Sequence, residues 1–251
     1  MIKARRHGAT TIPPAWLILA ALAAAGCAGS ERTTPAVLTT PSASLPAHAR
    51  ATQSAGAAML FGEVQRELAA MRVTHYRHTT RVDEASATFF YDCSGLLDYA
   101  IGRARPADAN ALPTSTTARP LAGDIEGYLH RGLSRPIQGW QALTRVDELG
   151  AGDVIAWQAT EDFTTGDTGH VMIVLGAPTR NPARPGEWLV RVADSTLNPH
   201  ASDSRHPGTT GLGTGTIGLV VDDGDAPTAF YWRGGLSKQA KPTEIALGRP
   251  L

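Results

Sequence analysis

The sequence predicts an α+β domain in which helices come first along the chain and one antiparallel β-sheet follows. Residues 57–71 carry apolar side chains at helical spacing, with charged residues between them. A second helix is expected to begin at Cys93, directly after the N-capping residue Asp92, and a third over residues 121–133. Short β-rich runs separated by turn-forming residues then predict consecutive antiparallel strands at 154–157, 170–175, 188–192, 216–221 and 229–232.

Two segments between these elements are expected to be irregular. Residues 105–120 predict a loop, because Pro106 stops the second helix. The run Gly-Leu-Gly-Thr-Gly at residues 211–215 has the glycines of a phosphate-binding loop, but no Lys-Ser/Thr follows and it precedes a strand. We expect it to form a turn or a mobile flank of the active site.

The first residues have the pattern of a bacterial secretion signal. A cationic start that includes Lys3 and Arg5 precedes an apolar run from Ala15 to Ala25, which is about half the roughly 20 residues needed to cross a bilayer. Small residues then precede Cys27, so the end of the signal resembles a lipobox.

Cys27 would thus become an acylated N-terminus and anchor the protein to a membrane. Ala24 stands where a lipobox usually has Leu, so ordinary cleavage after Ala28 and secretion is the alternative. Residues 1–27 are therefore interpreted as the signal, 28–54 as a flexible tether rich in Thr, Pro, Ser and Ala, and 55–251 as a single extracytoplasmic domain.

Composition and charge exclude several partners. The 23 basic and 23 acidic residues balance, so no overall field would attract nucleic acid, and we expect a monomer without a nucleic-acid partner. Two histidine pairs, His75 with His78 and His200 with His206, could suggest a metal. Neither pair has an acidic or cysteine ligand set at a familiar spacing, so we expect no metal and no other cofactor.

Cys93 is the candidate nucleophile. It remains unpaired because the signal accounts for the other of the two cysteines. A helix N-terminus stabilises a thiolate through its exposed N–H groups, and the same groups can stabilise the oxyanion of a tetrahedral intermediate. A thiolate also needs an imidazole, and His170, which follows Gly169 at the mouth of a predicted strand, is the best candidate for the base.

Three sequence blocks occur in the order found in one family. They are Tyr-Asp-Cys-Ser-Gly-Leu-Leu at 91–97, Leu-Gly-Ala-Gly-Asp-Val-Ile-Ala-Trp at 149–157 and Thr-Gly-His-Val-Met-Ile-Val-Leu-Gly at 168–176. Together they resemble the signature blocks of NlpC-type cell-wall peptidases, over roughly residues 74–194. The resemblance implies a papain-like fold, a triad of Cys, His and a third polar residue, and cleavage of peptide bonds in peptidoglycan stem peptides.

The same resemblance assigns substrate-binding roles. Asp92 and Ser94, on either side of the nucleophile, would bind the free amino end of the substrate. Tyr76 would correspond to the family tyrosine that contacts the oxyanion region, although Arg77 and His78 stand where the family has Gly-Gly.

Asp194 is the predicted partner that orients His170. Strand alternation places both on one face of neighbouring strands, and a hairpin centred on Pro182 would pair His170 with Asp194. In that register Met172 faces Val192 and Val174 faces Val190. NlpC-type members more often have His at this position, and His200 and Asp203 in the following loop are the competing candidates.

The sequence therefore predicts a thiol-dependent hydrolase that cleaves an amide bond in peptidoglycan peptides through a Cys93 thioester. An amidase or acyltransferase acting on another amide or ester with the same residues is one alternative. A lipoprotein that binds cell-wall peptide without cutting it is the other.

Overall fold

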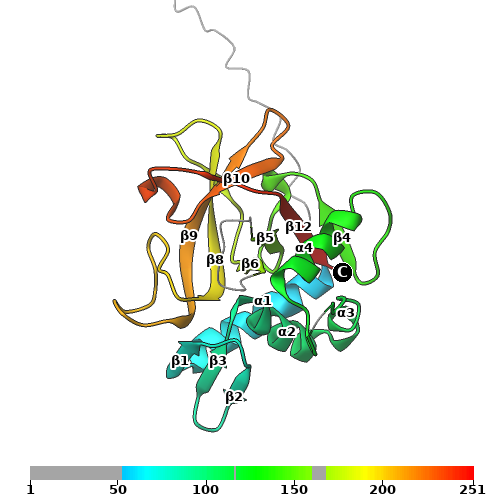
Figure 1. Cartoon of the computed structure of the whole chain (residues 1–251), viewed down its shortest axis with the longest axis vertical. Helices are drawn as coiled ribbons and strands as arrows, with labels where there is room; N and C mark the ends of the chain where they lie inside the picture. The colour runs from blue at the N-terminus through cyan, green and yellow to red at the C-terminus, as the bar shows by residue number, and fades with distance from the viewer. Residues whose placement is uncertain (1–52, 116, 160–167) are drawn as a thin grey trace, which may run out of the picture. The chain divides into compact units, whose positions relative to one another are not determined.

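The computed structural model describes residues 53–115, 117–159 and 168–251, all within a compact unit that runs from His48 to Leu251 (Figure 1). The expected signal, Cys27 and almost all of the expected tether lie outside the described residues. None of the described helices is both long and apolar enough to cross a membrane.

The three predicted helices are present. They are α1 (Ala55–Ala70), α2 (Cys93–Ala104) and α4 (Ala122–Arg131). The predicted loop after α2 is partly wrong, because a short helix α3 (Pro106–Ala109) forms there, with proline at the start of a helix where its missing N–H costs nothing. Two 3₁₀ turns, η1 (Val146–Glu148) and η2 (Gly234–Leu236), lie in the second half of the chain.

The larger sheet is antiparallel in every pairing between described strands, and the predicted consecutive strands are confirmed within it. Its order is β11 (Lys241–Pro242), β10 (Pro227–Tyr231), β9 (Gly211–Val221), β8 (Glu187–Thr196), β6 (Gly169–Val174), β5 (Val154–Gln158), β12 (Ile245–Pro250) and β4 (Trp140–Leu143), with β7 (Thr179–Arg180) also beside β8. The fold class is therefore α+β.

A second, three-stranded sheet was not predicted, so the expectation of a single sheet is wrong. It has the order β1 (Val73–Tyr76), β3 (Thr88–Tyr91), β2 (Arg81–Asp83), and β1 and β3 are parallel. These strands are too short to show a clear alternation of polar and apolar residues. Their place in the chain matters, because β3 ends two residues before Cys93 and so fixes where α2 begins.

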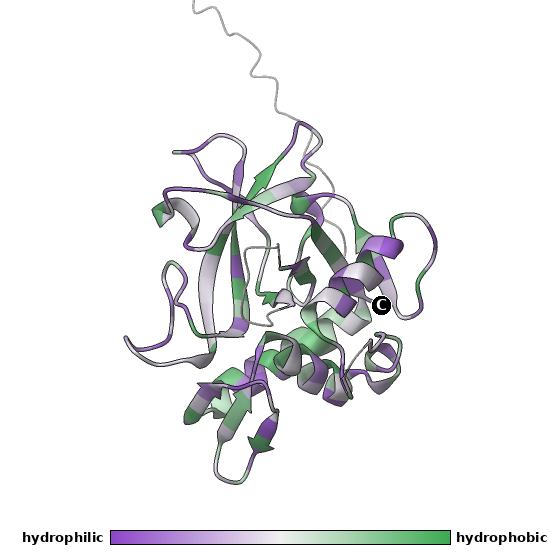
Figure 2. Cartoon of the chain, in the orientation of Figure 1, coloured by the Kyte–Doolittle hydropathy of each residue, from purple (hydrophilic) through white to green (hydrophobic). Residues whose placement is uncertain are grey.

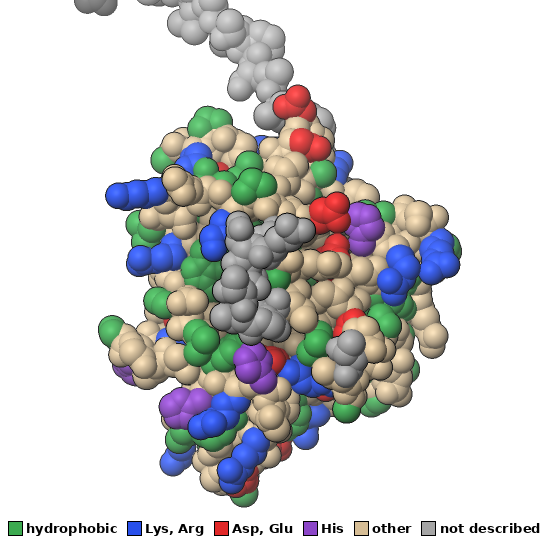
Figure 3. All heavy atoms as spheres, in the orientation of Figure 1, with side chains coloured by type: hydrophobic (Ala, Val, Ile, Leu, Met, Phe, Trp, Pro, Cys, Tyr) green, Lys and Arg blue, Asp and Glu red, His purple; other side chains and the backbone are tan. Residues whose placement is uncertain are grey.

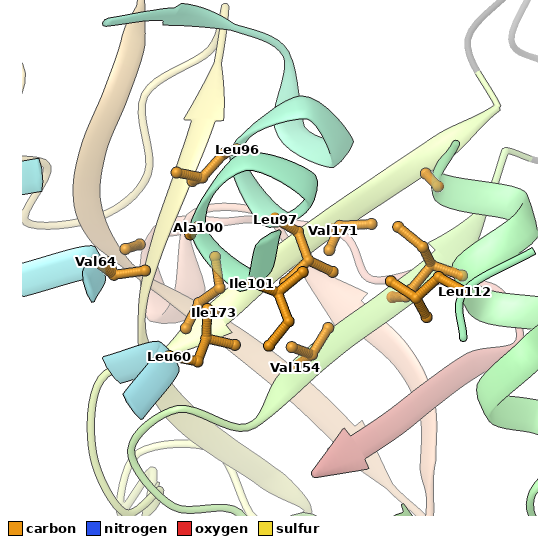
Figure 4. Close-up of a cluster of buried hydrophobic side chains, with 14 of the residues drawn as sticks. Leu60, Val64, Leu96, Leu97, Ala100, Ile101, Leu112, Val154, Val171 and Ile173 are labelled. Atoms are coloured by element: carbon orange, nitrogen blue, oxygen red, sulfur yellow. The ribbon is translucent and has the colours of Figure 1, made fainter. Parts of the chain in front are cut away.

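Helices α1 and α2 pack on one face of the larger sheet. Leu60 of α1 and Leu97 and Ile101 of α2 meet Val171 and Ile173 of β6 in a buried cluster (Figure 4). The hydropathy colouring shows hydrophobic and hydrophilic residues mixed along the same helices and strands, as expected for elements with one buried face (Figure 2).

The other face of the sheet encloses a second buried cluster that includes Met172 and Val174. Trp157 of β5 and Phe230 of β10 stack with ring centroids 4.3 Å apart, although β6, β8 and β9 lie between β5 and β10 in the strand order. The sheet must therefore curl, because a flat sheet would hold these two rings much further apart.

The C-terminal strand is held by a buried ion pair. Arg249 of β12 donates from Nε to Asp153 Oδ1 at 2.8 Å and from a terminal nitrogen to Asp153 Oδ2 at 2.6 Å. Asp153, from the second of the three sequence blocks, also accepts the N–H of Gly150. A buried, bidentate ion pair of this kind has a well-defined geometry, so it holds residues 149–157 against β12.

The predicted register between β6 and β8 is wrong by two residues. Val174 pairs with Val192, where we expected Val190. The two strands are not one simple hairpin, because the chain leaves β6 at Leu175, passes Pro178 and forms β7, which pairs with Trp188 and Leu189 at a further shift. A shift of two keeps every side chain on its expected face, so His170 and Asp194 still share one.

Buried Glu67 makes stability depend on pH. Tyr91 donates a hydrogen bond to its Oε2 at 2.7 Å, while Oε1 has no partner among the described atoms. Burial raises the pKa of Glu67 to about 7, against the opposing hydrogen bond from Tyr91. The folded state therefore favours the protonated acid. The resulting contribution to the free energy of unfolding is complete below about pH 4.3, the pKa of Glu in the unfolded chain, and is lost as the pH rises to about 7.

We predict that the free energy of unfolding falls across that pH window by up to about 3 kcal/mol more in the wild-type protein than in Glu67→Gln. Glutamine has nearly the same shape and does not titrate. Urea unfolding at pH 4.5 and 7.5 measures the difference, and parallel pH dependence in the two proteins would contradict it.

Candidate active site

Cys93 is the first residue of α2. Asp92 caps this helix, since its Oδ1 accepts the N–H of Gly95 at 2.8 Å. Cys93 is unpaired, almost fully buried, and lines a cavity of about 50 Å³ together with Tyr76 and Gly169. The thiol therefore lies at a helix N-terminus, as predicted.

His170, at the start of β6, lies between Cys93 and Asp194. Its Nε2 is 2.7 Å from Asp194 Oδ2, and its side chain also hydrogen-bonds with that of Cys93, which leaves Nδ1 for the sulfur. Burial opposes charge on this imidazole, but the Cys93 and Asp194 side chains outweigh it and raise the pKa of His170 to about 10. A cationic imidazole thus faces the sulfur at neutral pH.

Asp194 is fully buried and makes hydrogen bonds with three basic side chains. Besides His170, His200 Nε2 lies 2.9 Å from Oδ2, and Arg205 donates to Oδ1 at 2.6 Å. Although burial opposes ionisation, the charge of His200 and the hydrogen bonds from both histidines hold the pKa of Asp194 well below its usual range. The contact predicted between His170 and Asp194 is present, through diagonal neighbours of the sheet.

Two acceptor groups face the ring nitrogens of His200. Its Nδ1 lies 2.9 Å from the carbonyl oxygen of Trp232, which can only accept, and its Nε2 faces the Asp194 carboxylate. Of the competing candidates, His200 contacts the same Asp194 oxygen, Oδ2, as His170. Asp203 accepts hydrogen bonds from the backbone N–H of His200 and from Arg205.

The glycine-rich run at 211–215 makes room for these groups. It is part of β9, so the expectation of a turn is wrong, but the run does lie beside the candidate site, where Gly213 pairs with Asp194. A Cβ on Gly213, the residue paired with Asp194, would lie 2.6 Å from Arg205 Cγ, and one on Gly215 would lie 2.5 Å from His200 Cβ. Side chains at either position would push His200 and Arg205 away from the carboxylate.

Arg119 covers the two residues on either side of the nucleophile. It donates to Asp92 Oδ2 at 2.6 Å and to Ser94 Oγ at 2.6 Å. The exposed His78 side chain is also 3.3 Å from Asp92 Oδ2. Sequence reasoning missed Arg119, because it lies between α3 and α4 in a segment without periodicity and belongs to no motif. The carboxylate expected to bind a substrate amine is thus already paired.

An aromatic pocket of about 440 Å³ opens on the other side of His170. Trp157, Phe230 and Trp232 line it, and the Trp232 ring lies edge-on to His170 with centroids 5.0 Å apart. Lys241 and the exposed Arg233 also belong to its lining. Tyr76 borders both this pocket and the small cavity at Cys93.

Among the described residues, two groups of three side chains could approach a metal ion: His170, Asp194 and His200, and separately Glu126, His130 and Glu244. In the first group the ligand atoms are already in direct hydrogen bonds of 2.7 and 2.9 Å. Tetrahedral Zn²⁺ would hold them roughly 3.3 Å apart, and Arg205 adds a positive charge beside them. This group fits a proton-transfer network better than a metal.

No protein-family model, no curated protein and no solved structure matches this chain. The interpretation of the site therefore depends on its own geometry.

We predict that Asp194→Asn slows alkylation of Cys93 by iodoacetamide at pH 7 at least about tenfold, because an amide neither favours the imidazolium nor fixes its tautomer. His200→Gln should slow it less, since Asp194 keeps Arg205 and His170. Peptide mass spectrometry at Cys93 gives the rates, with Cys93→Ser as the unlabelled control and circular dichroism to verify folding. A larger effect of His200→Gln would contradict the assignment of Asp194.

Proposed function

We propose that this chain is an extracytoplasmic, papain-like cysteine hydrolase of the NlpC type that cleaves an amide bond in peptidoglycan peptides. One observation carries the proposal: His170 lies between the thiol of Cys93 at a helix N-terminus and a carboxylate, Asp194, that three donors hold in place. Nucleophile, base and orienting group in this order are what acyl transfer through a thioester requires.

In the first half of the reaction, the Cys93 thiolate attacks the carbonyl carbon of the amide and forms a C–S bond. The oxyanion that develops would accept a hydrogen bond from the N–H of Cys93, in the helix turn whose N–H groups lack intrahelical partners. In this proposal Tyr76, at the border of the two cavities, supplies a second contact. The His170 imidazolium then protonates the leaving amine as the C–N bond breaks.

In the second half, His170 is neutral and acts as the base. It takes a proton from water, the hydroxide attacks the thioester, and the acid product leaves as the C–S bond breaks. Asp194 stays ionised throughout and stabilises the imidazolium each time it forms. The aromatic pocket beside His170 would hold the part of the substrate on the leaving side, with Arg233 and Lys241 suited to an anionic group there.

Arg119 sets the preference at the other side of the nucleophile. The family resemblance implies that Asp92 and Ser94 bind a free amino end, but here a guanidinium pairs with both. A substrate ammonium group would meet a neutralised carboxylate and a nearby positive charge. We therefore expect this protein to accept peptides whose amino end is blocked or extended at least as well as peptides with a free amino end.

Two other functions use the same cleft. An acyltransferase would resolve the thioester with an amine in place of water, and a binding protein would hold the peptide without forming the thioester. A membrane anchor on Cys27 is compatible with all three and would place the cleft outside the cytoplasm.

The test is incubation of the purified protein with a defined muropeptide library that contains each peptide with a free and with an acetylated amino end, followed by mass spectrometry. We predict hydrolysis products with the wild-type protein and none with Cys93→Ala. Arg119→Gln should shift the preference towards free amino ends by roughly tenfold, the equivalent of about 1.4 kcal/mol.

No product from any muropeptide while Cys93 is intact and reduced would contradict the hydrolase. Retention of peptide without turnover would then favour the binding protein, and products formed only with an added amine would favour the transferase.

A further inference from the structure

The second cluster of possible ligands, Glu126, His130 and Glu244, lies apart from the catalytic residues. Glu126 and His130 are one helical turn apart on α4, so their side chains lie on the same face. Glu244 directly precedes β12, whose first residue pairs with Trp157 of β5. One nitrogen and two carboxylate oxygens from these three residues lie within 4.8 Å of one another.

Glu126 has an unusual environment for a carboxylate. It is 2 % exposed, and its Oε2 accepts a hydrogen bond from Gln158 Nε2 at 2.6 Å. Oε1 is buried without a hydrogen-bond partner among the described atoms, and His130 Nδ1 lies 3.8 Å from it, beyond hydrogen-bond range. An unpaired carboxylate oxygen in a buried position costs free energy unless something binds it.

We propose that Glu126, His130 and Glu244 form a binding site for a divalent transition-metal ion, of which Zn²⁺ is the representative probe. Two carboxylates and one neutral imidazole compensate a charge of plus two. An imidazole ligand favours zinc over calcium, which prefers oxygen ligands alone. His130 and Glu244 are exposed, so they can close the small remaining distance, and water can complete the coordination. Figure 3 shows acidic side chains beside a histidine over α4 and the start of β12.

The site has a consequence for the fold around the active site. Gln158, which holds Glu126, is the last residue of β5 and pairs with Gly169, the neighbour of His170. An ion bound to Glu126 would therefore join α4, the end of β5 and the start of β12 at one point, and we expect it to stabilise the folded state by mass action.

Calorimetric titration of Zn²⁺ into the Cys93→Ser protein tests the proposal, because this background removes the catalytic thiol as a competing ligand. We predict one site that Glu126→Gln abolishes and that His130→Ala and Glu244→Gln each weaken at least about tenfold. His206→Ala, which removes another exposed histidine, should bind Zn²⁺ unchanged.

The same variants measured by thermal unfolding in EDTA separate metal binding from structure. His130→Ala and Glu244→Gln should have the melting temperature of their parent in EDTA and should lose the increase that Zn²⁺ produces. Absence of one-to-one binding in the parent protein, or binding that persists undiminished in His130→Ala and Glu244→Gln, would overturn the proposal.

Discussion

The buried carboxylate of Asp194 is the interaction on which the candidate site depends. An isolated charge in this position would cost several kcal/mol, and removing one member of a buried ion pair typically costs about 3–5 kcal/mol. Here two histidines and Arg205 share the compensation. Because the carboxylate keeps its charge, it fixes the orientation of His170 and favours the protonated imidazole that faces Cys93.

The surrounding structure can be understood from that requirement. His200 and Arg205 can reach Asp194 only because β9 has glycine at 213 and 215, where a Cβ would collide with them. Asp203 accepts hydrogen bonds from both residues and so holds the loop that carries them. On the other side of His170, β3 and the Asp92 cap determine where α2 begins and thus where the sulfur lies. Two separate parts of the chain therefore converge on one imidazole.

Much of this arrangement could be predicted from sequence because it depends on local patterns. The N-cap before Cys93, the period of α1 and the alternation along β6 and β8 all follow from neighbouring residues. The exact register of β6 and β8 could not, because it is determined by the β7 excursion. The prediction that His170 and Asp194 meet was nevertheless correct, since a shift of two residues preserves the face of every side chain.

The residues that sequence reasoning missed act over long distances. Arg119 reaches Asp92 from a loop without periodicity, and Arg249 reaches Asp153 across 96 residues. The alternating glycines at 211–215 were a usable signal, because glycine on one face of a strand indicates that another group approaches closely. Paired with the nearby His200 and Arg205, they could have indicated which side chains surround Asp194.

The protonation state of His170 tests the proposed ion pair most directly. Nitrogen-15 NMR of the imidazole across pH 5 to 11 would show it in wild-type protein and in Cys93→Ser. We predict a cationic ring at neutral pH with a pKa of about 10 in the wild type, and a lower pKa in Cys93→Ser because the contribution of the sulfur is lost. A neutral His170 at pH 7 in the wild type, or the same titration in both proteins, would contradict the proposed pair.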